Sequence, residues 1–166
     1  MGMIRSISDW ASIAEVIFGI AVLVTLVILI IGIRANTDIT RVAVYESHID
    51  SLMEWRSQLL QDRDIARLYE AFTGNDTENL DSTDRLRLVQ LVANNFNIYE
   101  KAYYAQRYGV MGPSEASRFE AMSCVQYDSA RANEWVLEIL DRIMTAEFMS
   151  FLRDNCKDDR LAFPEI

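Results

Sequence analysis

Two hydrophobic patterns divide the chain: an uninterrupted apolar run near the N-terminus and, after it, apolar positions that recur at helical spacing. The run, VIFGIAVLVTLVILIIGI, covers residues 16–33 and contains no charged side chain. With a rise of ~1.5 Å per residue, a helix of this length extends about 27 Å, close to the thickness of the hydrocarbon core of a bilayer. We therefore expect a transmembrane helix at 16–33, preceded by an N-terminal flank at 1–15.

Two other interpretations of the run fit less well. A buried helix of a soluble core usually has a shorter apolar stretch and a polar face. A cleavable signal peptide would explain the basic Arg5 before the run, but it requires small residues at the cleavage site. Here Ile33 is bulky and Arg34 is charged. These features indicate an uncleaved, single-pass anchor in contact with the lipid bilayer.

The charges beside the run predict its orientation. On the N-terminal side Arg5 is accompanied by Asp9 and Glu15, whereas Arg34 and Arg41 follow the run. Basic residues close to a membrane helix tend to remain in the cytoplasm. The bias, a single residue, favours a cytoplasmic C-terminal domain.

A first amphipathic helix is expected after a short polar joint at 34–38, where Asn36 or Thr37 can cap it. Its apolar positions recur at helical intervals up to the turn signal Gly74-Asn75-Asp76. These positions are Val42, Tyr45, Ile49, Leu52, Leu59, Ile65, Leu68, Tyr69 and Phe72. The pattern predicts a helix over residues 39–72, straight or kinked.

Three further helices follow the same kind of pattern. The second begins at Asp81, whose carboxylate suits a helix start, and ends at the turn of residues 109–113. Its expected core positions are Leu86, Val89, Val92, Phe96, Tyr99 and Tyr103, with Leu88, Leu91 and Ile98 widening the face. Ser114 is expected to cap the third helix. The apolar residues of the third and fourth helices are Phe119, Met122 and Val125, and then Trp135, Ile139, Leu140, Ile143, Phe148, Phe151 and Leu152.

These elements predict an all-α protein in which one N-terminal transmembrane helix is followed by a four-helix up-down bundle at 39–155, because short links join antiparallel neighbours. Truncating Leu86 or Val92 to alanine is then expected to destabilise the bundle, as truncations in packed cores do. Residues 156–166 are expected to form a polar C-terminal tail.

A resemblance to a group of proteins rests on residues of the second helix and beyond. The stretch Asn95-Phe96-Asn97-Ile98-Tyr99-Glu100 is followed by Tyr103, Tyr104 and Gly109, then by a Trp-containing helix and Glu147-Phe148. This order resembles an uncharacterised family of bacterial single-pass membrane proteins, whose helical domain carries an NxxE, G, W and F pattern after one N-terminal span. The resemblance covers residues 10–155. It implies a bacterial inner-membrane protein and no particular activity.

Composition and motifs disfavour several classes of function. With 16 basic and 25 acidic residues, the formal net charge is −9. Nucleic-acid binding is therefore not expected, because its affinity comes mainly from basic groups. The sequence has no phosphate loop, no nucleophile elbow and no dinucleotide fingerprint. We expect no cofactor, no metal site and no catalytic residue, and hence no enzyme.

The single histidine and the two cysteines do not form a recognisable site. His48 has no second ligand on its own helix face, and it is expected to be a solvated helix residue. Cys124 and Cys156 are 32 residues apart without a CxxC motif, and each is expected to be a small buried side chain. In a cytoplasmic domain both would stay reduced.

Two functions remain open at this point. The first is a non-enzymatic accessory module that binds another membrane protein or assembles with copies of itself. The alternative is a small-ligand sensor or an enzyme with an apolar pocket in the bundle core, where Glu100 would be the carboxylate of interest.

Possible partner-binding residues are Tyr104, Arg107 and Tyr108 in the second helix. Tyr104 lies about 100° around the helix from Tyr103 and Tyr108 stands one turn further, so one face cannot hold both pairs. Tyrosine and arginine are enriched among residues that anchor interfaces. The competing interpretation is a wide core that buries both tyrosines.

Overall fold

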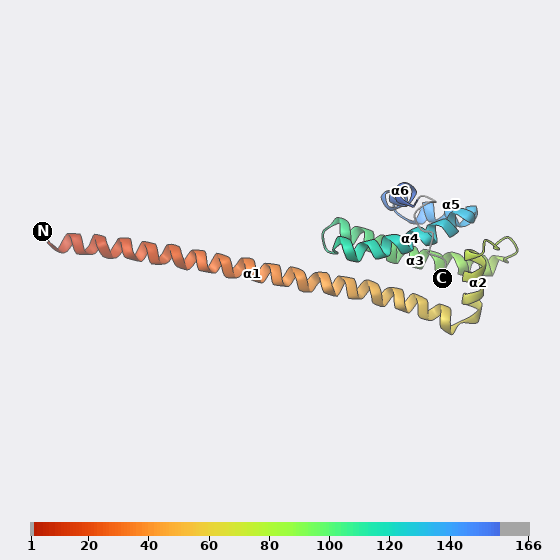
Figure 1. Ribbon diagram of the computed structural model, residues 1–166, viewed down its shortest axis with the longest axis horizontal. Coiled ribbons are helices and arrows are strands. Elements are labelled where there is room, and N and C mark those ends of the chain that lie inside the picture. Colours follow the sequence, from red (N-terminus) through yellow and green to blue (C-terminus); the bar gives the residue numbers. More distant parts are fainter. Residues whose placement is uncertain (1, 157–166) are drawn as a thin grey trace. The chain divides into compact units, whose positions relative to one another are not determined.

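The computed structural model describes residues 2–156, and all of the regular structure within that range is α-helical. Side chains are described for Trp10 and from Ile13 onward. The six helices are α1 (Gly2–Gln61), α2 (Arg63–Thr73), α3 (Ser82–Arg107), α4 (Pro113–Ala132), α5 (Glu134–Ile143) and α6 (Ala146–Asn155), as shown in Figure 1. The all-α prediction is confirmed. Of the expected polar tail, every residue except Cys156 lies outside the described residues.

The chain divides into two compact units, Met1–Thr40 and Arg41–Ile166. The first unit is the N-terminal part of α1, and it is long and apolar enough to cross a membrane. Its apolar side chains are exposed; Phe18 and Leu23, for example, are 72% and 63% exposed. A helix with apolar residues around its whole circumference needs an apolar environment to cover them.

The joint expected at 34–38 is continuous helix in the structure. Thr37 does not cap a new helix, because its hydroxyl donates to the carbonyl oxygen of Ile33 at 2.9 Å, one turn back in the same helix. Threonine makes this bond inside helices as well as capping them, so its presence in a polar stretch does not by itself mark a helix start.

Within the second unit, Asp62 interrupts the helix that was expected to run over residues 39–72. Its backbone is extended, with φ −118° and ψ 110°, and its carboxylate accepts hydrogen bonds from the backbone N–H groups of Asp64 and Ile65 at 2.9 and 3.2 Å. Aspartate favours such caps because its side chain replaces the missing helical acceptors. The expected single helix is therefore two helices, the end of α1 and α2.

The centre of the second unit is formed by α3 and α4, which pack against each other; α3 also packs against α2 and α5, and α4 also against α2, α5 and α6. Asp81 caps α3 as expected, accepting from the Asp84 N–H at 2.8 Å. The link to α4 passes through Gly109, whose φ of +70° favours glycine. Because α4 begins at Pro113 with Gly112 as its cap, Ser114 lies inside the helix and does not cap it.

The core face of α3 differs from the expected one at its N-terminal end. Leu88, Val92 and Phe96 are 0, 1 and 0% exposed, whereas Leu86 is 62% exposed. The prediction for Val92 is confirmed and the prediction for Leu86 is wrong. Leu86 and Leu88 lie about 200° apart around the helix, so only one of them can face the core.

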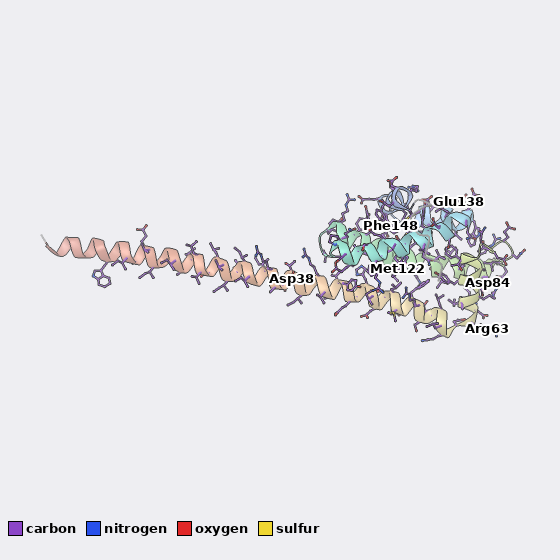
Figure 2. All side chains as sticks on the ribbon, in the orientation of Figure 1. Asp38, Arg63, Asp84, Met122, Glu138 and Phe148 are labelled. Carbon is purple, nitrogen blue, oxygen red and sulfur yellow. A yellow bond between two sulfur atoms is a disulfide. The ribbon has the colours of Figure 1, made fainter. Side chains whose placement is uncertain are left out.

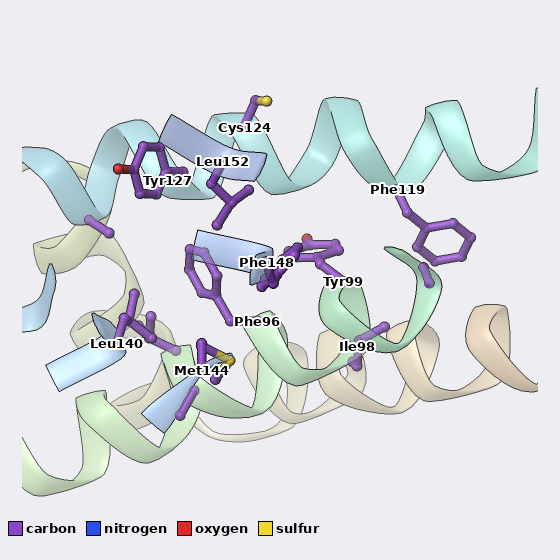
Figure 3. Close-up of a cluster of buried hydrophobic side chains, with 14 of the residues drawn as sticks. Phe96, Ile98, Tyr99, Phe119, Cys124, Tyr127, Leu140, Met144, Phe148 and Leu152 are labelled. Atoms are coloured by element: carbon purple, nitrogen blue, oxygen red, sulfur yellow. The ribbon is translucent and has the colours of Figure 1, made fainter. Parts of the chain in front are cut away.

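The expected fourth helix is divided into α5 and α6 at Met144 and Thr145. Met144 has an extended backbone, and the Thr145 hydroxyl caps α6 by accepting from the Phe148 N–H at 3.4 Å. The helix α6, on which Figure 2 labels Phe148, then buries Phe148 and Leu152 in the hydrophobic cluster that also contains Phe96 of α3 (Figure 3). Up to Cys156, where the described residues end, the second unit thus contains the end of α1 and five shorter helices, whereas four helices were expected.

Cys124 of α4 and Cys156, the residue that ends α6, form a disulfide, with their Cα atoms 5.0 Å apart. Both residues are buried, as expected, at 8% and 4% exposed. The expectation that they are reduced and separate is wrong for this structure. A spacing of 32 residues without a short motif does not reveal that the two helices bring these residues together.

Candidate interaction surface at the ends of α3 and α6

The three residues singled out as possible partner contacts lie at the C-terminal end of α3. Tyr104 and Arg107 belong to its last turns, and the helix ends at Tyr108. The first turn of α6 lies beside them, because Tyr104 and Arg107 both contact Glu147. We refer to Tyr104, Arg107, Tyr108 and Glu147 as the α3–α6 surface.

Tyr108 is the exposed member of this surface. Its side chain is 75% exposed, and its ring stacks on that of Tyr104, with centroids 6.0 Å apart and planes inclined by 18°. The alternative of a core wide enough to bury both tyrosines is wrong for Tyr108. Tyr104 is half-buried between the core and this exposed ring.

Tyr104 is fixed by polar contacts with α6. Its hydroxyl donates towards the Thr145 hydroxyl oxygen at 2.9 Å and towards a carboxylate oxygen of Glu147 at 3.2 Å. Its ring also meets that of Tyr103 edge to face, with centroids 5.1 Å apart. A ring held at its edge and at its hydroxyl has little freedom to rotate. Tyr104 is therefore a fixed ring on which Tyr108 stacks.

Arg107 is held on the same surface by two groups. Its guanidinium donates to the Tyr103 hydroxyl at 3.0 Å and pairs with the carboxylate of Glu147. The hydrogen bond that Arg107 donates to Tyr103 and then the negative charge of Glu147 raise the pKa of Arg107. The arginine keeps its charge, and its side chain is 54% exposed, so the guanidinium group is accessible from solvent.

Glu100, the carboxylate of interest for a ligand pocket, has a structural contact instead. One of its carboxylate oxygens accepts hydrogen bonds from the backbone N–H and the hydroxyl of Thr145, at 2.8 and 2.6 Å. Thr145 is the N-cap of α6, so Glu100 places negative charge at the start of that helix, where the helix dipole favours it. This carboxylate joins α3 to α6.

One cavity between α3, α4 and α6 offers little room for a ligand. This cavity has a volume of about 10 Å³ and is lined by Tyr99, Ser123 and Phe151, among others. Such a volume holds roughly one water molecule. A small organic ligand would not fit there without displacing core side chains.

His48 occupies a different environment from the expected one. It is half-buried, its Nδ1 lies 2.7 Å from the Val44 carbonyl oxygen, and its ring meets that of Phe119 edge to face at 5.8 Å. The expectation of a solvated helix residue is therefore wrong, because Phe119 of α4 covers this face of α1. Among the described residues, no group of three His, Cys, Asp or Glu side chains is arranged to hold a metal ion.

A buried polar residue that the sequence did not single out, Asn133, joins two helices. The Asn133 side chain donates to the Phe72 carbonyl oxygen at 3.0 Å and accepts from the Thr77 hydroxyl at 2.6 Å, and so fastens the start of α5 to the end of α2. Asn95 of α3 is buried as well, at 1% exposed. A polar residue among apolar ones was the available sequence signal for the contact of Asn133. It could not identify the partners Phe72 and Thr77, which lie in distant segments of the chain.

Searches with protein-family models, among characterised proteins and among solved structures find no match to this chain.

Proposed function

We propose that this chain is a non-enzymatic accessory module, anchored in the bacterial inner membrane by one helix, that binds another membrane protein or assembles with copies of itself. The observation that carries the proposal is Tyr108: a large aromatic side chain, 75% exposed, stacked on the fixed ring of Tyr104. Exposed aromatic residues beside an arginine are typical of interface anchors, since they bury large areas with little loss of entropy.

The anchor assigned in this proposal is the apolar stretch at 16–33. A single-pass protein meets its partners in or beside the bilayer, and the acidic composition, with a net charge of −9, makes nucleic acid an unsuitable partner. The flanking charges favour a cytoplasmic helical domain, whereas the disulfide between Cys124 and Cys156 favours an extracytoplasmic one.

The alternative, a small-ligand sensor or an enzyme with a pocket in the bundle core, has less support. It requires a cavity for the ligand, whereas the cavity among α3, α4 and α6 has a volume of about 10 Å³. It also requires a free carboxylate, and Glu100 accepts two hydrogen bonds from Thr145. These observations favour the accessory module.

The experiment compares Tyr108→Ala with Leu86→Ala in the full chain. Both residues are exposed, at 75% and 62%, and they lie at opposite ends of the same helix. The chain is purified in mild detergent, and its oligomeric state and retained partners are measured by light scattering and mass spectrometry. Tyr108→Ala is expected to weaken the association about tenfold or more, because truncating an interface anchor costs about 2 kcal/mol. Leu86→Ala is expected to leave it unchanged.

Two results would contradict the proposal. The first is a strictly monomeric wild-type chain with no retained partner. The second is an association that both variants retain equally. Unfolding is measured on the same samples, so that a loss of folding is not taken for a loss of binding.

A further inference from the structure

The disulfide between Cys124 and Cys156 carries an inference about where the helical domain lies. These are the only two cysteines of the chain, and they are paired with each other. Cys124 lies in the middle of α4, and Cys156 follows the last residue of α6. The bond therefore attaches the end of the last helix to the centre of the domain.

The helix α6 depends on such attachments. It has 10 residues, and helices this short are marginal in water unless they are packed against other elements. At its start, Thr145 is bound by Glu100 of α3; at its end, Cys156 is bound to α4. Between these points it buries Phe148, Met149 and Leu152. The position of the disulfide is that of a structural bond, which holds the end of α6 against α4.

The burial of the bond separates it from the disulfides that occur in the cytoplasm. Cytoplasmic disulfides are usually transient, and they belong to catalytic or redox-sensing cysteines. Sensing cysteines are exposed, because an oxidant and a reductant must reach the sulfur. Cys124 and Cys156 are 8% and 4% exposed. A buried pair that holds the last helix is typical of a domain that folds in an oxidising compartment.

We infer that the helical domain lies on the oxidising, extracytoplasmic side of the membrane, with residues 1–15 in the cytoplasm. In forming the bond, the two thiols lose two protons and two electrons as one S–S bond forms. The two electrons and two protons pass to an extracytoplasmic thiol–disulfide oxidase, whose own S–S bond breaks to give a dithiol. The inference reverses the orientation predicted from the flanking charges.

The flanking charges oppose this orientation only weakly. Arg34 and Arg41 follow the apolar run and Arg5 precedes it, so the difference is one residue. Such bias governs short loops, whereas long domains cross the membrane largely regardless of charge. The region after the run, residues 34–166, is a long domain, so the flanking charges have little influence on whether it crosses the membrane.

The orientation also specifies the class of partner, and in this respect it rests on the proposed function. If the α3–α6 surface binds another protein, that protein presents an extracytoplasmic domain or is a second copy of this chain. The orientation itself does not depend on any partner, because the disulfide lies within one chain.

The test reads the thiols of the full-length chain in its own membrane. Cells are quenched with acid and a small maleimide, and the denatured protein is then treated with polyethylene-glycol maleimide before or after reduction. We expect no polymer addition before reduction and two additions after it, because both cysteines are in the bond. Cys124→Ser and Cys156→Ser each leave one thiol, which the small maleimide caps, and they serve as controls that take up no polymer before or after reduction.

A reporter fused after Ile166 reads the side of the membrane. Alkaline phosphatase is expected to be active in this position and green fluorescent protein dark, since only the former matures outside the cytoplasm. Free thiols in the wild-type chain, or a fluorescent reporter with inactive phosphatase, would each overturn the inference. Both measurements use the wild-type sequence, so they do not depend on a variant that folds. An association that Tyr108→Ala retains in full, with the thiols still oxidised, would contradict the proposed function alone and leave the orientation intact.

Discussion

The two units of this protein are both helical, yet they differ in how far their apolar side chains are exposed. In the first unit apolar side chains such as Phe18 and Ile31 are 72% and 61% exposed. In the second unit Phe96 and Phe119 are 0% and 1% exposed. A helix in lipid satisfies its backbone hydrogen bonds internally and needs only apolar surroundings. Helices in water need one another, because short ones are marginal alone.

Because of this difference, substitution of a hydrophobic residue is expected to have a different effect in each unit. In the first unit they are present around the whole circumference, and substitution is expected to act on membrane insertion. In the second unit they form stripes, and substitution is expected to act on unfolding. The free energy of unfolding of the second unit and the membrane insertion of the first unit therefore distinguish these two roles.

The largest effect is expected from Phe96→Ala. Phe96 is fully buried, and its ring lies edge to face with that of Tyr99 at 6.2 Å. Truncating a buried phenylalanine removes apolar contacts and leaves a cavity, which costs about 3 to 5 kcal/mol. Denaturant unfolding of the full chain in detergent, followed by the fluorescence of buried Trp55, measures this change. Leu60→Ala, at a residue that is 89% exposed, is the control and is expected to have little effect.

Reducing the disulfide is expected to destabilise the second unit by about 3 to 4 kcal/mol, since it releases a loop of 32 residues in the unfolded chain. The measurement is unfolding with and without dithiothreitol. A double variant, Cys124→Ser with Cys156→Ser, should be equally sensitive to denaturant in both conditions. If the wild-type chain unfolds identically with and without the reductant, the bond does not stabilise the domain.

In the first unit, Leu26→Arg is expected to impair membrane insertion by about 3 kcal/mol, because it places a charge near the middle of the span. Carbonate extraction measures the fraction that remains in the membrane. Leu26→Ile should remain fully inserted. The unfolding of the second unit should be the same in all three proteins; a change there would contradict the separation of the two roles.

A smaller effect is expected from Thr145→Val, which removes the hydroxyl that caps α6. The variant loses the acceptor of the Phe148 N–H bond and the donor to Glu100. Loss of an N-cap costs about 1 kcal/mol. Thr145→Ser retains the hydroxyl and should be close to the wild type. Equal stability of the valine and serine variants would show that the cap contributes nothing measurable.

The fold could be predicted from the sequence where the signal is local. The uninterrupted run at 16–33, the cap at Asp81 and the turn at Gly109 each depend on residues close together in the chain, and the structure has helices and turns there. The helix breaks at Asp62 and Thr145 also have local caps, but both lie inside apolar periodicity that continues across them. The apolar periodicity therefore predicted one helix in each place where the caps Asp62 and Thr145 divide the chain into two helices.

The candidate site could be predicted only in part, because its contacts connect distant segments. Helical spacing alone placed Tyr104 and Tyr108 away from the core stripe. It gave no indication that α6 would supply Thr145 and Glu147 as their partners, 41 and 43 residues from Tyr104. The disulfide and the environment of His48 were missed for the same reason. Burial and pairing depend on which helices meet, and the sequence pattern did not contain that information.

The smallest effect is expected from Leu86→Ala, and it tests the register of α3. The apolar pattern assigned Leu86 and Val92 to the same core face, but they are 62% and 1% exposed. Surface substitutions usually change the free energy of unfolding by less than about 0.5 kcal/mol, whereas truncating Val92 leaves a small cavity and should cost about 2 kcal/mol. Denaturant unfolding of Leu86→Ala and Val92→Ala under identical conditions measures this contrast. If the two variants lose equal stability, Leu86 is covered in the native protein and α3 has the register that its periodicity predicts.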